Sequence, residues 1–201
     1  MIDGPAGPLE SVLEDPQASP RPGFAVICHP HPLHGGTMHN KVVHTLARTF
    51  QSRGLPTLRF NYRGVGTSAG HYDEGRGETA DALAVIAWGR ARWPDTSLTL
   101  AGFSFGALVS LSASSTTSPV RLISVAPPVR RAEAATAARP ACPWLIVQGD
   151  ADEIVDFREV QAFAAQLKPP AQLELLPGAE HFFHGRLDQL RTAVLSFMDS
   201  Q

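Results

Sequence analysis

The stretch Gly102-Phe103-Ser104-Phe105-Gly106 decides the fold of this chain, because it places a serine between two glycines where a strand gives way to a helix. Residues 97–101 before it alternate in polarity, and the mostly apolar residues 107–111 follow it. The two glycines allow the strand and the helix to approach closely around a strained turn. That turn exposes the serine hydroxyl near a helix N-terminus, where negative charge is favoured. We therefore predict that Ser104 is a nucleophile.

Length and composition are those of one ordinary globular domain. The 201 residues are 43% hydrophobic and 18% charged, and the net charge is −2. A chain of this length buries a core without needing disulfides. Its Lys and Arg residues are scattered, which gives no indication of a nucleic-acid partner. We expect a single domain over residues 1–201, with the Pro- and Gly-rich residues 1–22 as a loosely held edge.

The lack of a recognisable targeting or membrane-spanning segment, together with the two cysteines, predicts a cytoplasmic location without a membrane partner. The chain does not open on a basic and then apolar signal segment, and no apolar run approaches the roughly 20 residues that span a bilayer. Cys28 and Cys142 lie in or beside apolar runs, and two cysteines make no disulfide framework. We interpret both as thiols that act as small hydrophobic side chains.

Short apolar runs alternate with helical patterns along the chain. The seven candidate strands are residues 9–14, 24–28, 55–60, 97–101, 120–125, 143–147 and 172–176. Between or after them, apolar residues recur at helical spacing in 42–50, 83–87, the segment after Ser104, 157–167 and 187–197. Continuous apolar strands are typical of a parallel sheet that is covered on both faces. The pattern predicts a doubly wound α/β fold, with a mostly parallel sheet of about seven strands and helices on both faces.

One connection bears on access to the serine. Residues 126–142 join the strand that ends near Val125 to the strand that begins at Pro143. The Ala-rich part, residues 132–138, is able to form one short helix. A separate lid domain does not fit into this length, so we expect none.

Serine is a weak nucleophile that needs a base, and the base needs a carboxylate to orient it. The strand 143–147 runs into a loop with Asp150, Asp152 and Asp156, and the strand 172–176 runs into a loop with His181. Catalytic groups of such sheets lie beyond the carboxyl ends of the strands, where both loops begin. Asp156 suits a helix N-cap, and Asp150 is expected to point back into the sheet.

The order Ser…Asp…His is that of the α/β-hydrolases, and the chain resembles that superfamily from Gly23 to its C-terminus. The family patterns Gly-x-x-Asp and Gly-x-x-His match residues 149–152 and 178–181, which implies that Asp152 is the acid and His181 the base. The chain is also similar to a group of small, lidless bacterial hydrolases. The segments that carry this likeness are His29-Pro30-His31-Pro32, Gly35-Gly36-Thr37-Met38 and Arg59-Phe60-Asn61-Tyr62-Arg63-Gly64-Val65-Gly66-Thr67-Ser68. This resemblance implies the chemistry without implying a substrate.

An oxyanion hole needs two N–H donors that point at the tetrahedral intermediate. One is expected from Phe105, the residue after the nucleophile. The other is expected from the loop after residues 24–28, where Pro30 and Pro32 have no N–H. His31 and Leu33 remain as candidates, and the usual offset from the strand end favours His31.

Four histidines, two glycine-rich segments and several charged residues allow other interpretations. His29, His31, His34 and His39 suggest zinc, but residues 29–39 contain no Cys or acidic ligand, and their prolines and glycines fit a shaped loop. The glycines of residues 64–70 lack the dinucleotide-binding spacing and fit a tight turn. We therefore predict no metal and no cofactor. Structural ion pairs are expected among Arg63, Glu78 and Asp81, and a surface position is expected for His184.

These features predict a serine hydrolase that cleaves small carboxylic esters. Ser104 attacks the acyl carbon, His181 takes and returns the proton, and Asp152 orients His181. The expected partner is a small-molecule acyl substrate. Thioester or amide hydrolysis on the same residues is the alternative among enzymes. Outside enzymes, the alternative is a ligand-binding protein that retains the fold without its activity.

Overall fold

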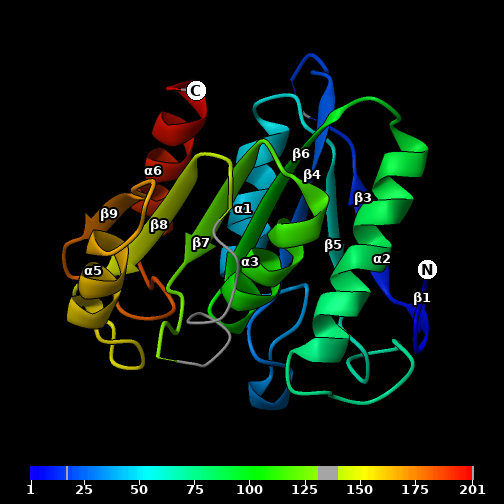
Figure 1. The fold of residues 1–201 in the computed structure, drawn as a ribbon, viewed down its shortest axis with the longest axis horizontal. Coiled ribbons are helices and arrows are strands. Elements are labelled where there is room, and N and C mark those ends of the chain that lie inside the picture. The colour runs from blue at the N-terminus through cyan, green and yellow to red at the C-terminus, as the bar shows by residue number, and fades with distance from the viewer. Residues whose placement is uncertain (17, 131–139, 201) are drawn as a thin grey trace.

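The computed structural model describes residues 1–16, 18–130 and 140–200, and its centre is a seven-stranded sheet (Figure 1). In spatial order the strands are β3 (Ser11–Glu14), β5 (Thr57–Phe60), β4 (Gly23–Cys28), β6 (Ser97–Phe103), β7 (Arg121–Val125), β8 (Trp144–Gly149) and β9 (Gln172–Leu176). The edge strand β3 is antiparallel to β5, and all other neighbours in this sheet are parallel. The predicted mostly parallel sheet of about seven strands is confirmed.

Helices cover both faces of the sheet, as predicted. The helices α2 (Arg76–Arg92), α3 (Phe105–Thr117) and α5 (Phe157–Ala165) pack on the face that is in front in Figure 1. The helices α1 (Lys41–Gln51) and α6 (Leu187–Asp199) pack on the face behind it. Along β4, Phe24 and Val26 join the first of these cores, whereas Ala25 and Ile27 join the second. Burial on both faces explains why the strands are continuous apolar runs.

Helix α1 illustrates how local sequence sets these elements. Its N-cap is Asn40, whose side chain accepts a hydrogen bond from the N–H of Val42 at 2.9 Å. Its apolar residues recur at helical spacing, and Leu46 and Phe50 are fully buried against the sheet. The amphipathic pattern and the cap therefore agree on where the helix begins and which face it buries.

The N-terminal residues differ from the expected loosely held edge over residues 1–22. The strands β1 (Ile2–Gly4) and β2 (Gly7–Leu9) form an antiparallel hairpin, and Ile2 and Leu9 are buried in the core. Strand β3 follows directly and pairs along its whole length with β5. The two hairpin strands have three residues each, too few for an alternating pattern to be visible in a stretch rich in Gly and Pro.

The connection between β7 and β8 runs from Ala126 to Pro143, and the structure describes its residues 126–130 and 140–143. This length is too short for a separate lid domain. The short helix predicted at residues 132–138 lies outside the described residues. In the part of the chain that the structure describes, no helix is both long enough and apolar enough to span a bilayer.

The parallel strands bring the expected site residues to one edge of the sheet. The strands β4, β6, β8 and β9 all run in the same direction, so their carboxyl ends meet at that edge. The loops that follow these strands carry the residues predicted for the oxyanion hole, the nucleophile, the acid and the base. The fold thus positions four loops, far apart in sequence, around one point.

Candidate active site

Ser104 occupies a strained turn between β6 and α3. Its backbone angles are φ 54° and ψ −120°, a conformation that residues with a Cβ seldom adopt. Its N–H donates to the carbonyl of Val125 on the neighbouring strand β7 at 2.8 Å. The half-buried serine is therefore held by the sheet in a geometry that local preference alone does not favour.

The two glycines beside Ser104 are required by close contacts. A Cβ on Gly102 would overlap the carbonyl of Gly106, and a Cβ on Gly106 would overlap the carbonyls of Cys28 and His29. Strand β6, helix α3 and the end of β4 therefore approach more closely than side chains allow. This is the role that the sequence pattern predicted for the glycines.

Ser104, His181 and Asp152 are joined by a continuous chain of hydrogen bonds. The His181 Nε2 atom lies 3.1 Å from Ser104 Oγ, and His181 Nδ1 lies 2.9 Å from Asp152 Oδ2. An ionised carboxylate can only accept, so Nδ1 carries the proton and donates to Asp152, which leaves Nε2 as the acceptor for the serine hydroxyl. The side chains of His181 and Asp152 are 3% and 0% exposed, so water does not compete for the bond between them.

Asp152 is held in its ionised form. Its Oδ1 atom accepts hydrogen bonds from the N–H groups of Ile154 and Val155, at 2.9 Å and 2.8 Å. Burial acts to raise the pKa of this carboxyl, but the hydrogen bonds from His181 and from these two N–H groups outweigh burial, so the pKa lies below its usual value. The residue can therefore orient the histidine and balance a positive charge on it.

Two further carboxylates of this loop contact the loop that carries the histidine. Asp150 Oδ1 accepts a hydrogen bond from the N–H of Gly178 at 2.6 Å, and Glu153 Oε2 accepts one from the N–H of His181 at 3.1 Å. The expectation that Asp150 points back into the sheet is therefore wrong, because its side chain is exposed at the loop and reaches the neighbouring one. Both contacts fix the backbone that carries the His181 ring.

Asp156 and His184 lie where they were expected. The Asp156 side chain accepts a hydrogen bond from the N–H of Arg158 and caps helix α5, which confirms the predicted N-cap. The side chain of His184 is 66% exposed and its Nδ1 atom lies 3.5 Å from Glu180. The His181 ring is instead bound by Asp152 and Ser104.

His29 joins the loop after β4 to the loop after β5. It is fully buried, its Nδ1–H donates to the carbonyl of Pro30 at 2.7 Å, and its Nε2 accepts from the N–H of Tyr62 at 3.1 Å. Burial lowers the pKa of His29 to about 3, against a smaller opposing effect of the Pro30 bond. His29 is therefore neutral, and both ring nitrogens are used within the protein.

His31 is the N-cap of the short 3₁₀ helix Pro32–His34 that follows β4, and Leu33 lies within this helix. The Leu33 N–H points to the Nδ1 atom of His31 at 3.3 Å, which occupies the donor that Leu33 would offer to an oxyanion. The His31 Nε2 atom lies 3.3 Å from the hydroxyl of Tyr72, and the His31 ring centre lies 4.9 Å from that of Phe105. The assignment of the second oxyanion donor to His31 stays a prediction.

The loop after β5 is held by a buried ion pair. Arg63 binds the carboxylate of Asp81 through two of its nitrogens, and its backbone N–H donates to the same carboxylate at 2.9 Å. The predicted pairing of Arg63 with Asp81 is confirmed. Glu78 is instead bound by the backbone N–H groups of Asp73 and Gly75, so it caps α2 and orders the preceding turn.

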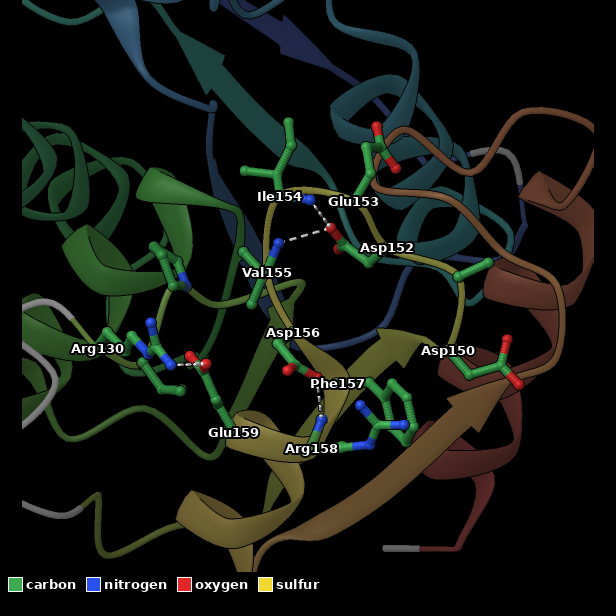
Figure 2. A pocket seen from close by; sticks show the side chains of 13 residues that line it. Arg130, Asp150, Asp152, Glu153, Ile154, Val155, Asp156, Phe157, Arg158 and Glu159 are labelled. Atoms are coloured by element: carbon green, nitrogen blue, oxygen red, sulfur yellow. Dashed lines mark hydrogen bonds and ion pairs between the residues drawn. The ribbon is translucent and has the colours of Figure 1, made fainter.

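A cavity of about 700 Å³ opens beside the acid-bearing loop (Figure 2). Its lining runs from Pro128 to Arg130 and from Asp150 to Glu159, and an ion pair between Arg130 and Glu159 crosses it. Ser104 and His181 are not part of this lining. Asp152 turns its carboxylate toward the N–H groups of its own loop, as Figure 2 shows.

Titratable groups elsewhere do not form a metal centre in the described part of the chain. No group of three or more His, Cys, Asp or Glu side chains is arranged there to bind an ion. Burial raises the pKa of Cys28 to about 12, so this thiol is a poor ligand and a poor nucleophile.

Sequence patterns missed two side chains that contact the triad. Glu153 binds the backbone of His181, and Gln148 donates to Asp152 Oδ2 at 2.9 Å. Glu153 is one acid in an acidic loop, and nothing in the spacing distinguishes it. Gln148 is a polar residue at the end of an otherwise apolar strand. This position was the one sequence signal that could have identified it as a contact of the acid loop.

Comparison with known proteins agrees with this geometry. Residues 31–141 match the family model described as serine aminopeptidase, S33. An uncharacterised protein of Rickettsia prowazekii is 31% identical over 98% of this chain and 87% of its own length.

Two solved structures are similar over nearly their whole length. An alpha-beta serine hydrolase homologue from Coxiella burnetii has 49% identity and a TM-score of 0.94, over 97% of this chain and 94% of that one. A serine hydrolase without a lid from Xanthomonas campestris has 45% identity and a TM-score of 0.95, over 99% and 92%. With a sheet, a serine turn and loops of the same kind, this chain belongs to the α/β-hydrolase superfamily and to its serine aminopeptidase S33 family.

Proposed function

We propose that this hydrolase cleaves small carboxylic esters through an acyl-enzyme, with Ser104, His181 and Asp152 as its catalytic triad. The observation that carries the proposal is the hydrogen-bond chain from Ser104 Oγ through both nitrogens of His181 to Asp152 Oδ2. Ser104 attacks the acyl carbon while His181 removes its proton. His181 then protonates the leaving alcohol, and water releases the acyl group by the same steps in reverse roles.

The oxyanion is bound by the backbone N–H groups of Phe105 and His31. Phe105 is the first residue of α3, where backbone N–H groups point out of the helix end. The engagement of the Leu33 N–H with the His31 ring supports His31 as the second donor. The His31 ring is fixed by Tyr72 and Phe105, which keeps this loop in place beside Ser104.

Three observations support a small substrate. Ser104 is half-buried rather than fully buried, the connection after β7 is too short for a lid domain, and the cavity beside the acid loop does not include the serine in its lining. A serine outside the described cavity has few surrounding groups there to bind a large substrate. The two free cysteines support the cytoplasmic location expected from the sequence.

The description of the matching family favours peptide-bond hydrolysis as the second candidate. An amide needs the same nucleophile, but its amine leaving group must be protonated as the bond breaks. The two candidates are separated by comparing p-nitrophenyl acetate with an amino-acid p-nitroanilide on the same preparation. A kcat/KM for the anilide that exceeds that for the ester would favour the aminopeptidase assignment.

The decisive experiment is the Ser104→Ala variant assayed on p-nitrophenyl acetate. We expect kcat to fall by about 10⁶, as in other triads, while the folded state remains as stable as the wild type within about 1 kcal/mol. A serine-directed phosphonate should abolish wild-type turnover in the same assay. Turnover that survives in clean Ser104→Ala protein would contradict the mechanism, and tight ligand binding without any turnover would favour a receptor with this fold.

A further inference from the structure

Gln148 is a fully buried polar side chain directly beneath the acid of the proposed triad. It precedes Gly149 at the end of β8, where the strand gives way to the acid-bearing loop. Its Nε2 atom lies 2.9 Å from Asp152 Oδ2, 3.1 Å from the carbonyl of Val155 and 3.3 Å from the carbonyl of Gly149. The amide thus bridges both ends of the loop that holds Asp152.

The surroundings determine which way the amide points. All three atoms around Nε2 are acceptors, and one of them belongs to an ionised carboxylate. An amide turned the other way would place its oxygen against these acceptors, which is electrostatically unfavourable. The opposite atom, Gln148 Oε1, is buried and has no hydrogen-bond partner among the described residues. What this side chain contributes therefore lies in the hydrogen bonds that its Nε2 group donates.

Asp152 Oδ2 receives two donors, because His181 Nδ1 also lies 2.9 Å from it. The other oxygen, Oδ1, is occupied by backbone N–H groups of the loop. With the first oxygen held by the loop, the Gln148 amide is the side-chain contact that fixes the second oxygen in the direction of the histidine. It also draws negative charge away from that oxygen.

We propose that Gln148 is a positioning residue of this site, which acts through Asp152 by holding Oδ2 toward His181 and by limiting how strongly that oxygen attracts the imidazolium. The inference rests on the proposed triad. The hydrogen bonds of Gln148 itself go to Gly149, Asp152 and Val155. Its effect should therefore appear in the histidine's behaviour and not in substrate binding.

The expected consequences follow from losing this donor. An Asp152 that is less well held spends less time in the productive orientation, so kcat falls and KM stays the same. Without the donor, Oδ2 has more charge facing His181, and the neutral base form is reached only at higher pH. The other carboxylates that face the histidine loop, Asp150 and Glu153, are the same in every variant, so their effect cancels in the comparison.

The test compares Gln148→Met with the wild type on p-nitrophenyl acetate from pH 5 to 9. Methionine has nearly the same shape and no donor. We expect kcat to fall about tenfold with KM within twofold, and the midpoint of the acid limb of kcat/KM to move up by about half a unit. In Gln148→Asn the amide is drawn back from Asp152 by about 1.5 Å, so this variant should move the midpoint of kcat/KM in the same direction. It tests the proposal if the methionine variant does not fold.

Gln51→Met is the matched control. Gln51 is equally buried and donates its Nε2 to Thr57 Oγ1 at 2.9 Å, between α1 and β5 and away from the proposed triad. The Gln51→Met variant should be less stable than the wild type but keep the wild-type pH dependence of kcat/KM. A uniform loss of rate in Gln148→Met and Gln148→Asn, with no change of midpoint, would overturn the proposal, because packing alone would produce it.

A second arm separates this inference from the proposed function. In an Asp152→Asn background, Gln148→Met should change kcat/KM by less than twofold, because no carboxylate remains for it to act upon. The midpoint of the His181 ring titration, measured by NMR, should rise in Gln148→Met with the Asp152 carboxylate present. Because this readout needs no turnover, an unchanged midpoint would overturn the role of Gln148 even where the protein lacked esterase activity.

Discussion

At the residue scale, aspartate takes three different roles within seven positions of one loop, at Asp150, Asp152 and Asp156. Asp152 is buried and binds the His181 ring, whereas Asp150 is exposed and binds the backbone of Gly178. Asp156 turns the other way and caps helix α5. What differs is the set of donors that each carboxylate meets, and this set follows from where the loop turns after β8. Only Asp152 is directed at an ionisable partner.

The substitution Asp152→Asn should remove most activity without unfolding the protein. Asparagine has the same shape, but its amide favours the wrong tautomer of His181, an effect of about 10⁴ in kcat in a well-studied serine protease. The measurement is kcat on p-nitrophenyl acetate together with a thermal melt. Asp156→Ala is the control, and it should cost about 1 kcal/mol of stability through its lost cap while leaving kcat unchanged. Full activity in Asp152→Asn would mean that another carboxylate orients the histidine.

At the scale of elements, His29 connects the loop after β4 to the loop after β5 through its hydrogen bonds to Pro30 and Tyr62. Its folded-state pKa of about 3 lies below the value near 6.5 of an unfolded histidine. Between these values the unfolded chain binds a proton that the folded chain does not, so stability falls as the pH falls. The contribution is fully present above about pH 6.5 and is lost progressively toward pH 3.

We therefore expect His29 to make the protein about 2 kcal/mol less stable at pH 5 than at pH 7. Urea unfolding at both values, in the wild type and in His29→Gln, measures this as the difference between their pH dependences. His184→Gln, which removes an exposed histidine, should retain the wild-type dependence. Equal pH dependence in the wild type and His29→Gln would show that the buried ring is not the group responsible.

The elements that sequence predicted well are those whose pattern repeats. Helix α1 and the central strand β4 are long and apolar on the side or sides that they bury, so their periodicity reveals them. The hairpin of β1 and β2 escaped prediction because three-residue strands show no period and their burial of Ile2 and Leu9 depends on distant contacts. Sequence propensity reflects only local preference, whereas the β1–β2 hairpin is determined by tertiary packing.

The same distinction holds for the candidate site. Glycine spacing around Ser104 reflects a local steric need, so it was visible in the sequence. The role of Gln148 depends on a loop that folds back over its own strand, and the contact of Glu153 with His181 joins residues 28 positions apart. No spacing rule encodes such meetings, because they are set by where two loops lie on the finished sheet.

At the scale of the whole molecule, the parallel sheet places every proposed catalytic group beyond the carboxyl ends of its strands. Strand β9, which precedes the base, is at the edge of the sheet, and β6, which precedes the nucleophile, is near its centre. The loops after these strands must therefore reach toward each other across β7 and β8. The hydrogen bonds that Asp150 and Glu153 accept from backbone N–H groups of the histidine loop bridge the last part of that gap.

Because the connection after β7 is too short for a lid domain, the whole molecule should act on dissolved substrates without any opening step. We expect p-nitrophenyl acetate and butyrate to be cleaved far faster than the palmitate ester, since a half-buried serine at an open edge offers no long apolar channel. The rate on tributyrin should rise smoothly with concentration and show no jump where the substrate forms droplets. Such a jump is expected only when contact with a droplet opens a lid over the active site. A steep increase at that point, together with a preference for long acyl chains, would show that some segment covers the serine in solution.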